Sequence, residues 1–441
     1  MSEWIWFGIA ALLIAAWTGA VYLLHRRGLL ERFHLAPAGP FLMWKTVKGR
    51  ELIDRIARPR RLWRVFGDVA IVIVALTMAL TTLLLIWEAT LVQTQAVKDN
   101  APSPQLLLGL PGINPLIPLW YGIFGLTIAI VLHEFAHGVL SRVADVRIKS
   151  LGAIFLIVPM GAFVEPDEDE MKALPRRQRA RLYAVGPATN MILATIFAVL
   201  FSTMTVSSLV PVHEGIGVVA LSSDDSPAAV AGIQPLTVIT RYNDTLIRNS
   251  ADFQRAKALT APDDTIVIET YNPANATYWN YTVTLGRDSS GGPLIGIYGF
   301  DTNTDYYHPL SDSARFGGVP NAILLYVSLP FQGRAPIQEP ATHFYRIEGA
   351  WASVPAPIFY LLANAAYWLF WLNVMLGATN ALPAIPLDGG YIFKDGVAGL
   401  VARFKRGLEA EARDRIVKRV TYVFALFILA LILWQLIGPR L

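Results

Sequence analysis

Six apolar stretches, each about twenty residues long or longer, recur along this 441-residue chain. An α-helix needs roughly 20 apolar residues to cross the hydrocarbon core of a bilayer, so each stretch is long enough to span it. We therefore expect a polytopic α-helical membrane protein with about six transmembrane helices, and an ordinary soluble enzyme is excluded. The expected spans lie near residues 4–24, 66–92, 118–142, 180–206, 355–385 and 416–437.

Composition agrees with a membrane protein and narrows the chemistry. Hydrophobic residues make up 54% of the chain and charged residues only 16%, well below the 25% or so that is usual in soluble proteins. The chain has no cysteine, which excludes thiol nucleophiles, disulfides and Cys-ligated metal sites. Any metal must be bound by His, Asp or Glu. The net charge of +4 comes from basic loops beside apolar stretches, so it reflects topology and nucleic-acid binding is not expected.

The basic loops predict the orientation in the membrane. Lysine and arginine concentrate in residues 26–64, 142–181 and 394–415, and such loops face the cytoplasm. Alternation of six spans places all three on that side and puts residues 207–354 outside. We expect a multi-pass protein of the cell membrane, in contact with the lipid bilayer along its spans.

We expect six sections along the chain. They are 1–117, N-terminal transmembrane helices and a basic cytoplasmic loop; 118–206, the first half of the core; 207–300, an extracytoplasmic β-rich domain; 301–354, an extracytoplasmic linker region; 355–400, the second half of the core; and 401–441, a cytoplasmic loop and the last transmembrane helix.

The β-rich domain is indicated by alternating apolar residues between residues 215 and 296. Residues 226–256 resemble a PDZ domain, with a short helix at SPAAVAGI, a strand at TVITRYN and a helix that opens at Ser250. Where PDZ domains usually have a Gly-Asp pair, this chain has Pro235 and Leu236. The sequence offers no firm account of residues 299–350, which are rich in Pro, Gly and Asp.

The third stretch contains the run VLHEFAHGVL, which points to a metal site. His133 and His137 stand four residues apart, on one face of a helix, where two imidazoles can bind one ion. Glu134 is adjacent and suits the role of base in the H-E-x-x-H signature. Three ionisable side chains at bilayer depth are costly, and such residues are functional by default.

A catalytic zinc site normally has three protein ligands, so a third is expected elsewhere. The candidate is Asp388, an isolated carboxylate in the run NALPAIPLDGG. Pro383 and Pro386 interrupt the helix there, and non-helical backbone at membrane depth is tolerated where it lines a buried cavity. The predicted topology places Asp388 and the histidines near the same cytoplasmic side.

These motifs resemble those of the site-2 protease family, the intramembrane zinc metalloproteases. The resemblance covers most of residues 118–400. The matching runs are HEFAH at 133–137, the N-x-x-P-x-x-x-L-D-G pattern from Asn380 to Gly389, GPATN at 186–190, and GAFVEPDE at 161–168, which is similar to the family's membrane re-entrant β-hairpin.

The resemblance implies a role for each matching residue. His133, His137 and Asp388 would bind one Zn²⁺ ion, and Glu134 would activate water. Asn380 would be catalytic, holding substrate or the developing oxyanion. The alternative, purely structural role for both Asn380 and Asn190 is helix–helix hydrogen bonding. The implied substrate-binding residues are Asn190, Gly161, Ala162 and Phe163, the last three offering a strand edge to an unwound substrate.

The expected function is therefore zinc-dependent hydrolysis of peptide bonds within transmembrane segments of single-span membrane proteins. The family implies regulated intramembrane proteolysis, with substrates such as anti-sigma factors and a prior extracytoplasmic cut by a site-1-type protease. The PDZ-like domain would admit shortened stubs or bind their ends. Two alternatives remain: a different membrane zinc peptidase, which would use a Glu as third ligand, and a catalytically silent scaffold or chaperone that binds clients.

Overall fold

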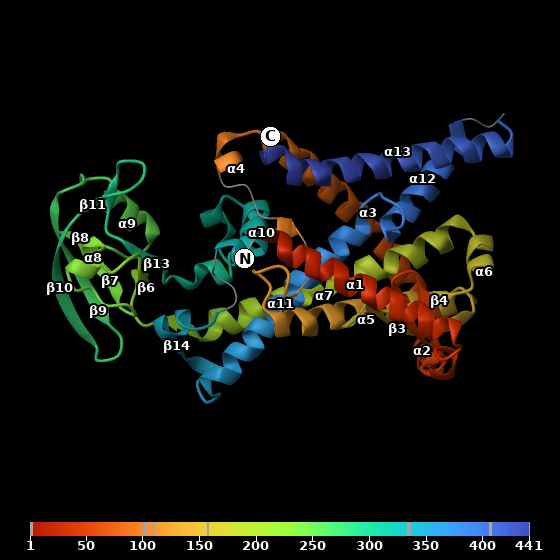
Figure 1. The fold of residues 1–441 in the computed structure, drawn as a ribbon, viewed down its shortest axis with the longest axis horizontal. Coiled ribbons are helices and arrows are strands. Elements are labelled where there is room, and N and C mark those ends of the chain that lie inside the picture. Colours follow the sequence, from red (N-terminus) through yellow and green to blue (C-terminus); the bar gives the residue numbers. More distant parts are fainter. Residues whose placement is uncertain are drawn as a thin grey trace. The chain divides into compact units, whose positions relative to one another are not determined.

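The long apolar helices are present where the sequence places them. The computed structural model describes residues 3–99, 104–107, 109, 111–156, 158–332, 337–404 and 408–440. Among the described helices, five are long and apolar enough to cross a membrane (Figure 1). They are α3 (Arg60–Leu91), α5 (Leu119–Val143), α7 (Arg176–Ser208), α11 (Ala356–Ala381) and α13 (Ala410–Ile437).

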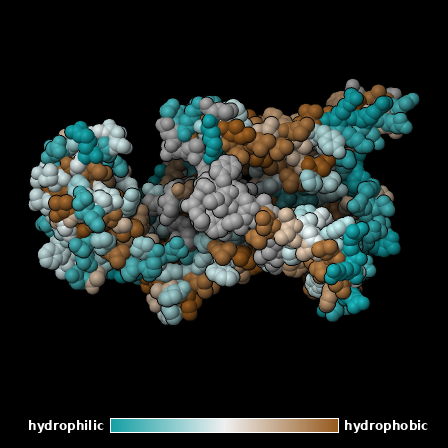
Figure 2. Space-filling model, in the orientation of Figure 1, coloured by the Kyte–Doolittle hydropathy of each residue, from teal (hydrophilic) through white to brown (hydrophobic). Residues whose placement is uncertain are grey.

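The first expected span coincides with a sixth helix, α1 (Glu3–Arg26). Only the part from Leu12 to Arg26 enters the comparison of span lengths, and it is shorter than a full span. Five of the six predicted spans are therefore found among the described residues. Figure 2 shows hydrophobic side chains spread over α3 and α13, as expected for surfaces that face lipid.

The chain forms two compact units, residues 1–196 with 368–441 and residues 197–367. In the first unit, α3 and α7 meet through small side chains, Ala70 and Val74 against Ala184 and Ala188. Small residues allow the backbones of apolar helices to approach closely, which favours van der Waals packing. The shorter helices of this unit are α2 (Arg50–Ile56), α4 (Gln95–Asp99), α6 (Glu168–Ala173) and α12 (Asp388–Phe404).

A four-stranded antiparallel sheet belongs to the first unit, with the order β1-β2-β3-β4. Its strands are β1 (Leu35–Ala38), β2 (Phe41–Thr46), β3 (Ile148–Leu156) and β4 (Val158–Pro166). The β3–β4 hairpin contains the GAFVEPDE run. The pairing of β2 with β3, which joins Lys45 to Gly152, was not predicted, and it leaves β4 at one edge of the described sheet.

The second unit contains a β-rich module, residues 216–301. Its six-stranded sheet has the order β10-β9-β7-β6-β13, with β8 paired to β7. Ile216, Val218, Ile239 and Ile268 form its core. The expected short helix, strand and helix are present as α8, β7 and α9. The elements are β6 (Ile216–Leu221), α8 (Pro227–Val230), β7 (Val238–Tyr242), β8 (Thr245–Leu246), α9 (Ser250–Lys257), β9 (Thr265–Asn272), β10 (Thr277–Thr284), β11 (Gly286–Arg287), β12 (Pro293–Leu294) and β13 (Ile297–Asp301).

The turn before β7 departs from the usual PDZ sequence in a way the structure makes visible. Leu236 adopts φ 63°, the left-handed conformation that glycine favours. The Thr237 hydroxyl donates a hydrogen bond to the Gln234 carbonyl, at 2.7 Å, and closes the same turn. A turn with glycine-like geometry is thus kept without glycine.

The remaining part of the second unit follows the β-rich module. Residues 304–307 and 313–316 form short 3-10 turns. Helix α10 (Val319–Ser328) comes next, and β14 (Tyr345–Ile347) pairs with β5 (Leu209–Pro211) just after α7. Residues 299–350, which the sequence left without an account, therefore include a helix and a strand.

We predict that Gly152→Ala destabilises the protein by about 3 kcal/mol or more, because the new Cβ would overlap the carbonyl oxygen of Trp44 on β2. Gly161→Ala on the neighbouring strand is the matched control, since its nearest neighbours are Ile130 side-chain atoms at 3.6 Å or more. Thermal unfolding of both purified variants is the measurement. Equal melting temperatures would contradict this account of the β2–β3 contact.

Candidate metal centre

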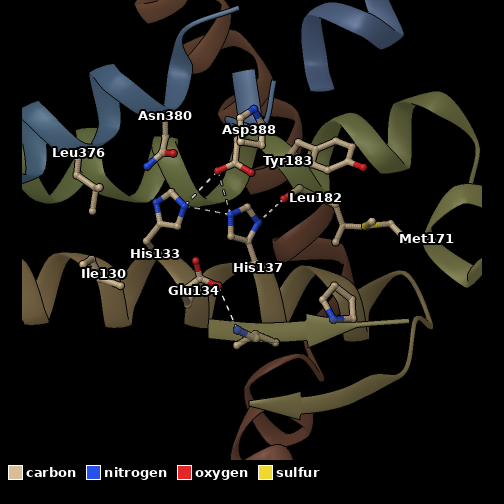
Figure 3. Close-up of a pocket in the computed structure, with 13 residues that line it drawn as sticks. Ile130, His133, Glu134, His137, Met171, Leu182, Tyr183, Leu376, Asn380 and Asp388 are labelled. Atoms are coloured by element: carbon tan, nitrogen blue, oxygen red, sulfur yellow. Dashed lines mark hydrogen bonds and ion pairs between the residues drawn. The ribbon is translucent and has the colours of Figure 1, made fainter. Parts of the chain in front are cut away.

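Three side chains from two distant segments converge on one point. His133 and His137 lie on α5, and Asp388 is the first residue of α12. The Nε2 atoms of the two histidines are 3.2 Å apart, and Oδ2 of Asp388 lies 3.1 Å from the first and 3.2 Å from the second. Figure 3 shows the carboxylate pointing at both imidazoles. The three donor atoms form a nearly equilateral triangle.

The size of this triangle fits a tetrahedral metal ion. Bond lengths of about 2.0–2.1 Å to zinc place any two ligand atoms of a tetrahedron about 3.4 Å apart, close to the three separations seen here. Two imidazoles and one carboxylate are a donor set that zinc accepts. His133, His137 and Asp388 are thus arranged as the sequence predicts for metal ligands.

Backbone contacts fix the tautomer of His137. Its Nδ1 lies 2.7 Å from the carbonyl oxygen of Leu182 on α7. A carbonyl can only accept, so Nδ1 carries the hydrogen and donates it. The lone pair is then on Nε2, directed toward His133 and Asp388, in the arrangement that second-shell carbonyls commonly impose on metal-binding histidines.

Gly186 on α7 leaves the space in which an ion would lie. A Cβ at this position would stand 2.5 Å from Nε2 of His133 and even closer to Nε2 of His137. Any side chain there would therefore occupy the volume next to both donor atoms. This explains the glycine of the GPATN run as a part of the metal centre.

The loop before α12 holds Asp388 in place. It folds back so tightly that a Cβ on Gly389 would overlap the carbonyl group of Ala381, and one on Gly390 would overlap the peptide that joins Ala384 to Ile385. The Gly-Gly pair is therefore required by close backbone contact. The turn presents the Asp388 carboxylate to α5.

Two further contacts join α12 to α7 in register with the metal centre. Arg179 donates two hydrogen bonds to Asp395, at 2.9 and 2.7 Å, and others to the carbonyls of Lys172 and Leu174. One turn further along, the rings of Tyr183 and Tyr391 stack with centroids 4.8 Å apart. We call these contacts the α7–α12 ladder; Asp388 facing the histidines near Gly186 is its next step.

Glu134 and Asn380 line the same cavity as the three donors. The cavity has a volume of about 340 Å³. Oε2 of Glu134 accepts a hydrogen bond from the backbone N–H of Val164 on β4, at 3.1 Å. Figure 3 shows Asn380 next to His133 at the end of α11. A further carboxylate, an amide and three donor atoms thus face one space.

The other predicted site residues lie elsewhere. Asn190 is fully buried, does not belong to the residues lining this cavity, and has no hydrogen-bond partner among the described residues for either amide atom. Gly161, Ala162 and Phe163 lie along β4, where Phe163 lines a neighbouring hollow rather than the cavity itself. Their substrate-binding roles stay predictions.

The neighbouring hollow continues along β4 toward α6 and is polar. Glu165 lines it, and hydrogen bonds from Ser150 and Lys45 hold the pKa of its carboxyl below the usual range. Asp167 caps α6 by accepting hydrogen bonds from the backbone of Asp169 and Glu170, which lowers the pKa of its carboxyl. This end of β4 is therefore charged near neutral pH.

Sequence analysis assigned no role in the site to Gly186 or Arg179, although both help to build the centre. The role of Gly186 could have been suspected, because a glycine followed by a proline is unfavourable inside an apolar helix and usually has a packing or functional reason. Arg179 was counted only as one of the basic residues that set topology, and its pairing with Asp395 spans 216 residues. A short sequence pattern cannot identify a partner that lies so far along the chain.

The chain matches a known protein family over most of its length. The family model described as "Peptidase family M50" matches residues 121–428. The matched range includes His133, His137 and Asp388, and it extends beyond residue 400, the predicted limit of the resemblance, into α13.

Two relatives cover most of the chain. A Methanocaldococcus jannaschii protein named "Uncharacterized protein" is 24% identical over 391 residues, 88% of this chain and 84% of its own length. A Clostridium acetobutylicum protein named "Putative zinc metalloprotease" is 25% identical over 299 residues, 60% of this chain and 82% of its own length. Among solved structures, the PDZ domain of an SdrC-like protein from Listeria monocytogenes is 24% identical and covers 22% of this chain and 95% of its own, with a TM-score of 0.18.

We predict that Gly186→Ala abolishes stoichiometric zinc binding, because its methyl group takes the space beside both Nε2 atoms. Gly396→Ala on α12 is the control, since a Cβ there meets nothing within 4 Å. Zinc content of the purified proteins, measured by elemental analysis, decides the matter. A full equivalent of zinc in Gly186→Ala would refute the position inferred for the ion.

We also predict that Asp395→Asn weakens zinc binding by about tenfold or more, because it breaks the α7–α12 ladder that positions Asp388. Asp68→Asn is the matched control: Asp68 receives bidentate bonds from Arg177 and Arg181 but joins α7 to α3. Competition with a chelator gives the dissociation constants. If both variants lose zinc equally, the ladder has no special role.

Proposed function

The chain belongs to peptidase family M50, and from this premise we propose that it is an endopeptidase that cleaves peptide bonds within the transmembrane segments of single-span proteins. Family membership makes the chain a zinc metallopeptidase of the site-2 protease type. The finer proposal is carried by one observation: His133, His137 and Asp388 converge beside Glu134 on helices apolar enough to cross a membrane.

The setting of the site supports cleavage within the membrane. Burying ionisable groups in an apolar helix costs roughly 2.5–3.5 kcal/mol each on insertion scales. A soluble domain could hold the same residues without that cost. Helix α5 carries three ionisable groups of this kind, His133, Glu134 and His137. Their position within an apolar helix supports a substrate bond that lies within the membrane.

The residues present can perform hydrolysis. A zinc ion bound by the three donors would activate water and polarise the scissile carbonyl. Glu134 would accept the proton of the attacking water and deliver it to the leaving amine nitrogen. Asn380 would donate a hydrogen bond from its amide to the oxygen that gains negative charge.

The edge of β4 is the proposed docking site for the substrate backbone. Val164 directs its N–H away from β3, toward Glu134. In the regular part of the antiparallel β3–β4 pairing, the backbone groups of every second residue on β4 point away from β3. The N–H and C=O of Ala162 therefore point away from β3, as the N–H of Val164 does. A substrate segment paired there as a strand would have its amides exposed beside the catalytic base.

The proposed location in the membrane and the proposed partners follow from the predicted topology and the family. We place the active site near the cytoplasmic side of the cell membrane and the β-rich module outside, as a PDZ-like filter for stubs left by a site-1-type protease. Substrates would be single-span regulators such as anti-sigma factors. The scaffold alternative is disfavoured, because a silent relative has no need to keep Glu134 together with all three donors.

We predict that Glu134→Gln lowers the rate of substrate cleavage by about a hundredfold to ten-thousandfold, because the amide cannot accept the proton of water. Zinc content should stay at the wild-type level, since Glu134 is not one of the three donors. The measurement is cleavage of a model single-span protein by the purified enzyme in lipid, with and without a chelator.

The control is the wild-type enzyme treated in parallel. A chelator should stop its activity, and added zinc should restore it. Equal activity of wild type and Glu134→Gln would end the protease proposal and favour the scaffold.

A further inference from the structure

Helix α10 has a buried apolar side and another apolar side that the described residues leave exposed. Ala322, Tyr326 and Leu329 form a buried stripe at helical spacing. Leu324 on the opposite side is 46% exposed, Ile323 beside it is 48% exposed, and Phe331, just beyond the helix, is 56% exposed. We call these three side chains the outer face of α10.

The sequence around the outer face lacks charge. Arg315 and Arg334 are the nearest charged residues on either side, and the fifteen residues from Gly317 to Phe331 contain none. Soluble proteins rarely leave a contiguous apolar patch of this kind in water. The helix has ten residues, a length of about 15 Å, so it is also too short to cross a bilayer.

A hydrogen bond to α7 shows how far along that helix α10 is bound; we call this position the level of α10. The hydroxyl of Tyr326 donates to the carbonyl oxygen of Ala198, at 3.2 Å. Helix α7 continues for ten residues beyond Ala198, to Ser208. At 1.5 Å per residue, this contact lies about 15 Å below the end of α7.

Helix α11 independently gives the same level. Tyr367 donates from its hydroxyl to the carbonyl oxygen of Tyr326, at 3.0 Å, eleven residues after α11 begins at Ala356. This corresponds to about 16 Å along the helix. The side chain of Asn364 also bonds both the N–H and the C=O of Ile337, the residue that resumes the described chain after α10. Helix α10 and the segment that follows it are thus both bound to α11 well away from the N-terminal end of that helix.

The two spanning helices present apolar side chains at this level. Val199 and Leu200 are exposed on α7, directly after Ala198, and Leu361 and Leu362 are exposed on α11. Helix α10 therefore lies among surfaces that are themselves apolar and uncovered within the described chain.

We infer that the outer face of α10 is immersed in the acyl chains of the membrane lipid. The inference rests on the proposed membrane location of α7 and α11. The helix enters the bilayer from the side of the β-rich module without crossing it. Tyr307, which leaves the module a few residues after β13, packs on Phe201 of α7, so the chain between module and α10 is anchored at the same level.

The natural absence of cysteine permits a clean test. Single cysteines are placed at Ile323 and Phe331, each is labelled with an environment-sensitive fluorophore, and the full chain is reconstituted in lipid nanodiscs. Quenching by acyl-chain nitroxide lipids and by aqueous iodide is then measured. Val199→Cys on α7 is the lipid-facing reference, and Leu259→Cys, which is 84% exposed in the β-rich module, is the water-facing one.

Both α10 labels should be quenched by lipid nitroxide as strongly as the Val199 label, and by iodide at least about fivefold less than the Leu259 label. A Val199 label quenched by lipid together with α10 labels quenched by iodide would overturn this inference and leave the proposed function intact. α10 labels quenched by neither reagent would also overturn it, since protein would then cover the face. If the Val199 label itself is quenched by iodide and not by lipid nitroxide, the proposed membrane location of α7 is wrong, and the inference about α10 falls with it.

Discussion

The centre of this protein depends on one close approach, that of the Asp388 carboxylate to the imidazoles of His133 and His137. Donor atoms only 3.1–3.2 Å apart would repel one another through their lone pairs unless a proton or a cation lies between them. A dipositive ion is the natural solution for three such atoms in an apolar surrounding. The surrounding structure brings α5 and α12 close enough for this approach, and α7 packs beside both.

Each helix contributes a different kind of constraint. Helix α5 sets the spacing of the histidines through its own periodicity, α7 contributes an empty place at Gly186 and a carbonyl acceptor at Leu182, and α12 brings the carboxylate. The ladder on Arg179 and Asp395 fixes the register between α7 and α12. An error of one residue in that register would turn Asp388 away from α5, because successive helical residues point about 100° apart.

The sequence predicts the parts of this arrangement that are local and leaves out those that are not. His133, Glu134 and His137 share one helical turn, and the Asp388 motif is marked by prolines and glycines, so both could be found from pattern alone. The strands β1 and β2 lie in a basic loop whose charge suggested only topology, and their pairing with β3 crosses more than a hundred residues. The contact between α10 and α7 is equally distant. Pairings of this kind are decided by packing, which no short pattern records.

One contact links the two parts of the proposed reaction. Glu134, the proposed base, accepts a hydrogen bond from Val164 on the strand edge where the substrate would pair. A strand that binds at Ala162 would therefore lie beside the proposed base, and a shift of β4 would break the contact between Val164 and Glu134. The rigidity of β4 comes from β3, and that of β3 from β2, whose close contact requires Gly152. Strand pairing remote from the metal centre thus supports the strand edge that contacts Glu134, so the N-terminal strands β1 and β2 stabilise the proposed docking site.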